Sequence, residues 1–253
     1  MENLVTNLHE QVKLAIKHTS NQHAVGIAFS GGVDSSLLAK VCSDLGYDIT
    51  LLTIGFANSH DVEFSKKIAT LLNLRHVISE ISKESFQQVS NEIRDQIGTD
   101  NLSWNENCIA FHYVSKLAAE NNIDTVLTSN GIDELFCGYN AYRLVVEGGE
   151  RAVFDLMDSK LENEIEMMKA INMISSKFGV KILQPFLSER FIDFAKPLPL
   201  AVKIKGRDDM LRKHAIRDLA LAVGVPSESA LKRKKALQYG SLIHKNLMAV
   251  RKT

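Results

Sequence analysis

The stretch that decides the fold of this 253-residue chain is Ala24-Val25-Gly26-Ile27-Ala28-Phe29-Ser30-Gly31-Gly32-Val33-Asp34-Ser35-Ser36. Its first six residues form a short apolar run between polar residues, which is typical of a buried parallel strand. The glycine pair ends that run. Apolar residues then recur at helical spacing from Val33 to Leu45, and Gly46 follows as a stop signal. We therefore predict a strand, a tight turn and a helix.

The same alternation continues on both sides of this stretch. A helical lead-in is predicted over residues 11–18, further buried strands over 49–54, 75–78 and 125–128, and helices over 61–72, 83–97 and 105–121. Alternation of this kind forces parallel pairing with right-handed crossovers. The sequence therefore predicts an α/β fold with a doubly wound parallel sheet.

No strong strand is predicted from Leu144 onward. Helices are predicted over residues 150–178, 188–195, 207–223 and 242–250, separated by prolines. We expect an α/β core over residues 1–143 and a carboxyl-terminal helical part over residues 144–253 that packs on it, the two forming one domain.

Composition excludes several classes of protein. No apolar run approaches the roughly 20 residues that a membrane span needs, and the acidic, weakly apolar start is unlike a signal peptide. We expect a cytoplasmic protein without a membrane partner. The three cysteines, Cys42, Cys108 and Cys137, are far apart and form no CxxC pair. They predict reduced, buried thiols rather than disulfides or a zinc site, with a reactive role left open for Cys137 because it lies beside motif residues described below.

The turn after the first predicted strand has the properties of an anion cradle. Gly31 and Gly32 let backbone N–H groups approach phosphate oxygens, the following helix adds its positive end, and Ser30, Ser35 and Ser36 add hydroxyl donors. The loop is neither a Walker A motif nor a GxGxxG fingerprint. A glycine-rich turn without a ligand is the alternative, but it gives no reason for hydroxyls and an aspartate to cluster there.

A second polar segment, residues 128–139, directly follows the fourth predicted strand and reads Thr-Ser-Asn-Gly-Ile-Asp-Glu-Leu-Phe-Cys-Gly-Tyr. Carboxyl ends of parallel strands meet at one edge of a sheet, so this segment should face the glycine-rich turn. Asp34 and Asp133 would then repel each other unless a cation lay between them. We expect Mg²⁺ there, with Asp34 and Asp133 as its ligands, and a solvated acidic turn as the alternative.

These motifs resemble those of a known family. The loop at residues 30–36 matches the SGGxDS signature of the PP-loop ATP pyrophosphatases, which cleave ATP between the α and β phosphates. Residues 128–139 are similar to the SGEGSDEIFGGY-type motif of the asparagine synthetase family, and residues 184–195 resemble its PFLD segment. Residues 209–213 resemble its next helix start, and residues 233–235 its Arg-x-Lys motif. The matches come in the family's order over residues 24–245, so the chain is identified as a member of this family.

The resemblance implies a PP-loop fold, ATP and Mg²⁺ as cofactors, and a set of site residues. Catalytic roles fall on Lys235, Asp133 and Glu134, with Lys235 on the phosphates in the transition state. Otherwise the basic run around Lys235 is a solvated face or a patch for polyanions. The residues implied in ATP binding are Phe29, Ser30, Gly31, Gly32, Asp34, Ser35, Ser36, Ile54 and Gly131. Among these, Phe29 and Ile54 would flank the adenine, or serve only as core residues.

The chain departs from the family at several positions. Glu2 follows Met1 where a glutaminase domain would begin with a nucleophilic cysteine. We therefore expect a stand-alone synthetase domain that uses free ammonia, another amine, or ammonia from a separate glutaminase subunit. Asn130 replaces a common glutamate, and an amide cannot serve as a general base. The charged residues expected before Pro185 are replaced by Ala170, Asn172 and Leu183.

Together these features predict an AMP-forming amide ligase that adenylates a carboxylate, with aspartate as the first candidate, for attack by ammonia. Its role would be in asparagine and amino-acid biosynthesis, and Tyr139 or Glu134 would shape the acceptor side. One alternative is a PP-loop enzyme that modifies tRNA, favoured by the basic carboxyl-terminal third. The lack of a cysteine pair opposes it, so nucleic acid is not an expected partner. Another alternative is a nucleotide-binding regulatory homologue whose synthetase activity has lapsed, suggested by Asn130.

Overall fold

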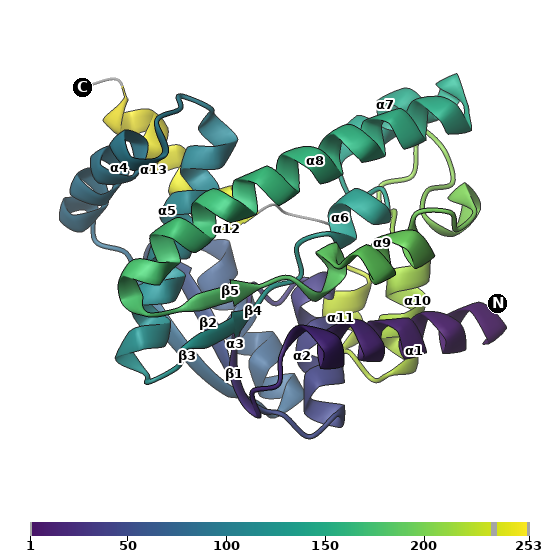
Figure 1. Ribbon diagram of the computed structural model, residues 1–253, viewed down its shortest axis with the longest axis horizontal. Helices are drawn as coiled ribbons and strands as arrows, with labels where there is room; N and C mark the ends of the chain where they lie inside the picture. Colours follow the sequence, from purple (N-terminus) through teal and green to yellow (C-terminus); the bar gives the residue numbers. More distant parts are fainter. Residues whose placement is uncertain (1, 234–236, 252–253) are drawn as a thin grey trace.

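The computed structural model describes residues 2–233 and 237–251, and its centre is a five-stranded parallel sheet (Figure 1). The strands are β1 (Ala24–Ala28), β2 (Asp48–Gly55), β3 (Arg75–Glu80), β4 (Thr125–Leu127) and β5 (Lys181–Leu183). Their order is β3-β2-β1-β4-β5, and every pairing is parallel. The predicted α/β fold with a doubly wound sheet is confirmed. Because the strand order reverses beside β1, the turns after β1 and β4 lie next to each other.

The two faces of the sheet support separate apolar cores. Val25 and Ile27 of β1 pack into one core, whereas Leu52 and Ile54 of β2 pack into the other. Successive side chains of a strand point to opposite faces, so a strand buried on both faces needs an almost continuous apolar sequence. This explains why the runs over residues 24–29 and 49–54 were readable as strands.

Helices cover both faces. The first core receives α1 (Glu2–Thr19), α2 (Val33–Asp44), α3 (His60–Leu72), α6 (Ile132–Leu135), α9 (Glu189–Ala195), α10 (His214–Ala222) and α11 (Ser227–Ala230). The second receives α4 (Lys83–Ile97), α5 (Leu102–Glu120) and α13 (Ile243–Val250). The long helix α8 (Glu150–Ser175) contributes to both cores and lies across the molecule (Figure 1). Shorter elements of the described residues are α7 (Asn140–Val145), α12 (Leu237–Gly240) and 3₁₀ turns over residues 146–148, 176–178, 185–187 and 200–202.

The expectation that no strand follows Leu144 is wrong. Residues 181–183 form β5, which hydrogen-bonds to β4 and completes one edge of the sheet. The segment after residue 143 therefore supplies part of the sheet as well as helices. The division into residues 1–143 and 144–253 remains a prediction. In addition, α1 is longer than predicted, and α10 begins at His214 rather than near residue 207.

The cysteines behave as predicted. Cys42, Cys108 and Cys137 are all buried and free. Burial raises the pKa of the Cys137 thiol to about 12, which disfavours the reactive thiolate. Among the helices that the structure describes, none combines the length and apolar composition that a membrane crossing requires.

Candidate active site

A cavity of about 260 Å³ opens at the carboxyl edge of the sheet. Its wall includes the glycine-rich turn after β1, the turn after β4, one face of α8, the side chain of Lys213, and residues 232–233 and 237–238. Eight of the predicted site residues line it: Phe29, Ser30, Gly32, Asp34, Ser35, Ile54, Asp133 and Glu134. The cavity thus brings together segments more than 180 residues apart in the sequence. Predicted Lys235 lies outside the described residues.

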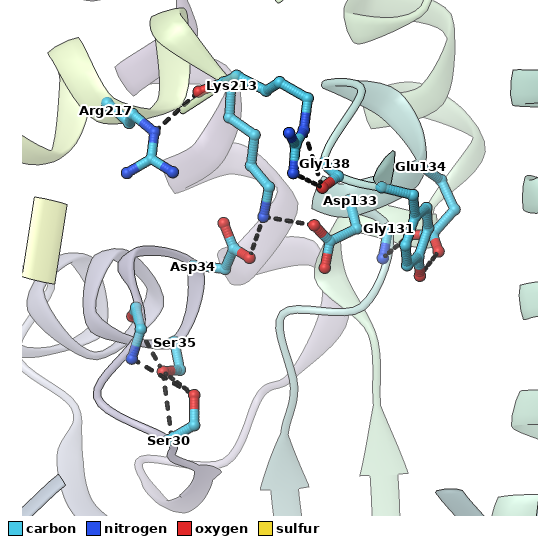
Figure 2. A network of polar contacts seen from close by, with 12 residues as sticks. Ser30, Asp34, Ser35, Gly131, Asp133, Glu134, Gly138, Lys213 and Arg217 are labelled. Carbon is cyan, nitrogen blue, oxygen red and sulfur yellow. Dashed lines mark hydrogen bonds and ion pairs between the residues drawn. The ribbon is translucent and has the colours of Figure 1, made fainter. Parts of the chain in front are cut away.

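The turn after β1 is held in shape by its own polar groups. Gly31 has a φ of 75°, which favours glycine. A Cβ there would also come within 3.2 Å of the Ser65 Cα. The Ser35 hydroxyl donates to the Gly32 carbonyl at 3.2 Å and lies 3.5 Å from the Ser30 hydroxyl (Figure 2). Gly32 then caps α2, so the amino-terminal end of that helix faces the cavity beside two hydroxyls.

A buried serine supports this turn from behind. The Ser229 hydroxyl on α11 donates to the Gly31 carbonyl at 2.7 Å and lies 3.0 Å from the Ser36 hydroxyl. Gly31 and Ser36, both predicted to bind ATP, are therefore turned toward α11 and do not line the cavity. Their position gives them a role in shaping the loop.

The two predicted acidic ligands meet, and a lysine joins them. Lys213 Nζ lies 2.5 Å from Asp34 Oδ2 and 2.5 Å from Asp133 Oδ1 (Figure 2). The lysine side chain is only 1% exposed, and each carboxylate is 18% exposed. Burial lowers the pKa of Lys213, but the two carboxylates outweigh it, so the net shift is upward and the ammonium stays charged. The cation expected between the two acids is thus supplied by the chain itself.

The backbone around Lys213 is strained and braced. Arg212 and Lys213 both have positive φ, at 52° and 53°. The Asp209 carboxylate accepts from the backbone N–H of Arg212 at 3.0 Å and from His214 at 2.6 Å, and these contacts hold the pKa of Asp209 at about 2 despite its burial. The Arg212 guanidinium in turn donates to the Gly138 carbonyl at 3.0 Å. Strain of this kind persists only where surrounding contacts enforce it, and it is common at functional sites.

Asp34 and Asp133 also fit a magnesium ion that arrives with a nucleotide. The Asp34 Oδ1 atom is buried and has no hydrogen-bond partner among the described residues. No group of three or more metal-binding side chains is present in the described part of the chain. Mg²⁺ is ordinarily held by one or two carboxylates plus substrate phosphates, so two aspartates beside a turn that could hold phosphates would be sufficient donors.

The turn after β4 is organised by Glu134. Its carboxylate accepts from the Gly131 backbone N–H at 3.0 Å and from the Tyr139 hydroxyl at 2.5 Å. Burial, followed by the nearby Glu134, raises the pKa of Tyr139 well above its usual range. Gly131 has a φ of 105°, and a Cβ there would come within 2.6 Å of the Phe186 carbonyl. Gly131 was predicted to bind ATP. It does not line the cavity, and its backbone N–H already donates to Glu134.

The predicted adenine-flanking residues lie at the apolar end of the wall. Phe29 and Ile54 are 4% and 2% exposed, and both line the cavity. Phe29 packs edge-to-face against His76 at 5.8 Å between ring centroids. The His76 ring lies 2.8 Å from the Thr53 hydroxyl, and burial lowers the pKa of His76 to about 4. A neutral, fixed imidazole therefore supports Phe29 from outside the cavity.

Helix α8 supplies part of the cavity wall, and sequence reasoning missed it. Lys160, Asn163, Glu164 and Met167 line the cavity at helical spacing. Lys160 Nζ lies 5.6 Å from the centre of the Tyr139 ring. The available signal was Glu164, a carboxylate on the otherwise apolar buried stripe of α8.

Three replaced positions near Pro185 have structural roles here. Asn172 accepts from the backbone N–H of Ile182 at 3.0 Å and so ties α8 to β5. Ala170 and Leu183 pack against the two apolar cores. These positions, which carry charge in the motif that the chain resembles, contribute to packing in this chain.

Basic groups complete the site. Lys232 and Arg233 line the cavity at the point where the described chain is interrupted.

Lys213 was missed as a site residue, although it ends the segment over residues 209–213 that matched a family helix start. Its role depends on a contact with Asp34, which is 179 residues away. Sequence spacing alone carries no signal for such a contact.

Comparison with known proteins identifies the family of the chain. A family model described as asparagine synthase matches residues 7–174. A putative glutamine-hydrolyzing asparagine synthetase of Methanocaldococcus jannaschii is 28% identical, covering 89% of this chain and 47% of that protein. The glutamine-hydrolyzing asparagine synthetase of Gallus gallus is 24% identical, covering 95% and 44%. The chain therefore spans less than half the length of these relatives.

A solved structure of NMN synthetase from Francisella tularensis shares the fold, with a TM-score of 0.50 at 16% identity, covering 94% of this chain and 76% of that one. That likeness concerns the arrangement of the sheet and its helices. The family model covers well over half of the residues, so the chain belongs to the asparagine synthase family.

Proposed function

We propose that this chain carries out the synthetase half-reactions of an ATP-dependent amide ligase. ATP adenylates a carboxylate, pyrophosphate leaves, and ammonia converts the acyl adenylate to an amide and AMP. One observation carries the proposal, namely the meeting of Asp34 and Asp133 on Lys213 beside the phosphate loop. Aspartate is the first acid to test, because the curated relatives are named asparagine synthetases. The corresponding role is in amino-acid biosynthesis.

Different parts of the cavity wall would bind different parts of the nucleotide. Phe29 and Ile54 provide an apolar place for the base, and the amino-terminal end of α2 with Ser30 and Ser35 takes the phosphates. Asp34 and Asp133 would hold Mg²⁺, which when bound neutralises phosphate charge. Lys232 and Arg233, with Lys235 beyond them, add positive charge where pyrophosphate leaves.

The chemistry is balanced in two displacements. A carboxylate oxygen attacks the α-phosphorus, a P–O bond forms, and the bond to the bridging oxygen of pyrophosphate breaks. The nitrogen lone pair of ammonia then attacks the acyl carbon, a C–N bond forms, the C–O bond to AMP breaks with its electron pair leaving on AMP, and the nitrogen gives up one proton to solvent or a base. The chain contributes orientation and fixed positive charge at both steps, and Lys213 keeps the two aspartates in register.

Product analysis tests the proposal. The protein is incubated with ATP, Mg²⁺, aspartate and ammonia, and AMP, ADP, pyrophosphate and asparagine are measured by chromatography. AMP, pyrophosphate and asparagine in equal amounts are expected, with loss of all three in Asp34→Asn. The exposed Lys169→Met variant is the matched control, because Lys169 contacts only Glu166 on the surface of α8 among the ion pairs of the described residues. Formation of ADP would refute the mechanism, and AMP formation with another acid would refute aspartate.

A nucleotide-binding homologue without synthetase activity is the second candidate. Two observations favour it: Asn130 stands where a carboxylate is common, and Asn172 is committed to holding β5. Tight binding of ATP, with no AMP released in the presence of any acid and ammonia, would support this function over a ligase.

A further inference from the structure

The Asn130 side chain forms a pair with a buried acid from another element. Its Nδ2 donates to Glu164 Oε1 at 2.5 Å. We propose that Glu164 is the general base that takes the proton from the attacking amine, a carboxylate that α8 delivers to the place where the turn after β4 lacks one. This inference rests on the proposed ligase function and assigns a residue to its second step.

The orientation of the Asn130 amide is set by its own turn. The Thr128 hydroxyl donates to Asn130 Oδ1, so the NH₂ group is directed at Glu164. An amide held in this way can only donate to the carboxylate, and the contact fixes the direction of the Glu164 side chain. Asn130 thus positions a base that it cannot itself provide.

Glu164 occupies an unusual place on its helix. It is 4% exposed and belongs to the same buried stripe of α8 as Met157, Leu161 and Met168. A carboxylate on an apolar stripe is costly, and a role in packing alone would favour an apolar residue. Yet Glu164 also lines the cavity, so its buried carboxylate can reach a molecule bound there.

The other acids of the cavity wall have different commitments. Asp34 and Asp133 share Lys213. Both oxygens of Glu134 already accept hydrogen bonds, from Gly131 and Tyr139. Asp61 lies on α3 with its carboxylate 3.0 Å from the His60 ring. Glu164 is the acid that α8 contributes to the cavity wall, and its carboxylate meets Asn130 of the turn after β4.

The proton balance of the second step requires such a group. When ammonia attacks the acyl adenylate, the new C–N bond leaves nitrogen with an extra proton and a positive charge. Glu164 accepts that proton as the C–O bond to AMP breaks, and AMP leaves with the bonding electron pair. The proton then passes to water. Adenylation of the acid involves no such transfer, so Glu164 should matter for the second step only.

The test separates the two steps in the isosteric variant Glu164→Gln. Acid-dependent exchange of labelled pyrophosphate into ATP reports adenylation, with aspartate, glutamate and succinate as probe acids. Amide formation from ammonia reports the second step. We expect exchange at the level of the wild type and amide formation lower by about 100-fold or more. Glu166→Gln, an exposed change on the same helix, is the matched control.

Two further measurements distinguish a catalytic role of Glu164 from a structural one. Hydroxylamine attacks acyl adenylates as a much weaker base, so hydroxamate formation should survive in Glu164→Gln. Adding Asn130→Glu to that variant returns a carboxylate to the turn and should restore part of the ammonia-dependent activity. Recovery of this kind is not expected if Glu164 merely supports the fold.

Each contrary outcome has a distinct meaning. Equal amide formation in Glu164→Gln and wild type would overturn the base assignment while leaving the ligase intact. Equal loss of exchange and amide formation would also overturn it, because Glu164 would then act in binding or folding. Absence of acid-dependent exchange in the wild type would overturn the proposed function, and the base assignment with it.

Discussion

Replacing Lys213 with methionine removes the ammonium that joins the two aspartates while keeping a side chain of similar length. The lysine is 1% exposed, and its Nζ lies 2.5 Å from each carboxylate. With an effective dielectric constant of about 20, each contact has a gross attraction of roughly 7 kcal/mol. Most of that attraction is offset by the cost of desolvating the charges.

The net effect is smaller but still large. Removing one partner of a buried ion pair usually lowers the free energy of unfolding by about 3–5 kcal/mol, because the remaining charge stays buried. For a domain near this size that corresponds to a fall in Tm of roughly 6–20 °C. The carboxylates are partly exposed and can admit water, which places the expectation toward the lower end.

Urea unfolding followed by circular dichroism, with and without Mg²⁺, measures this effect. Because Lys213→Met leaves two carboxylates facing each other, added Mg²⁺ should stabilise the variant more than it stabilises the wild type. Lys169→Met is the control, since this exposed residue should change the free energy of unfolding by less than about 0.5 kcal/mol. A Lys213→Met variant that unfolds with the wild type would refute a structural role for the shared ammonium.

Three further outcomes are expected. Ser229→Ala removes the hydroxyl behind the phosphate loop, so it should lower the free energy of unfolding by about 1–3 kcal/mol and weaken ATP binding in calorimetry. Asn172→Ala leaves the backbone N–H of Ile182 without its acceptor, so hydrogen exchange of that amide should become faster. The pKa of His76 is lowered to about 4 by burial, so its neutral form is favoured in the fold. Relative to His76→Gln, the wild type should therefore lose stability as pH falls from about 6.5 to 4, as measured by urea midpoints, and a difference independent of pH would contradict this.

Strands buried on both faces were predictable from sequence because they need long apolar runs. The strands β1 and β2 show this, with Ile27 and Leu52 each fully buried in a different core. By contrast, β5 has three residues, and only Ile182 among them is buried. An edge strand of this length is fixed by its neighbours, here by pairing with β4 and by Asn172 of α8. Its own sequence holds too little pattern to predict it.

The site divides in the same way. The glycine-rich turn lies within seven consecutive residues, 30–36, so its glycines, hydroxyls and Asp34 could be identified from the sequence. The partner of Asp34 could not be identified in this way. Lys213 reaches Asp34 because Asp209 and Gly138 hold the strained backbone around Arg212 in place. The Mg²⁺ prediction assumed that no side chain would neutralise the two acids. That assumption fails, although Asp34 Oδ1, which has no hydrogen-bond partner among the described residues, still offers a ligand.

The charged groups of the cavity fall into sets that come from different parts of the chain. Two aspartates and one lysine leave the centre with a net charge of about −1, which suits a divalent cation, while Lys232 and Arg233 at another part of the wall suit phosphates. These groups come from the loops after β1 and β4 and from the carboxyl-terminal segment. Another part of the cavity wall comes from α8, where Glu164 meets Asn130 of the turn after β4. Under the proposed function, we therefore expect changes on α8 to affect the choice of acid or the second step more than the binding of the nucleotide.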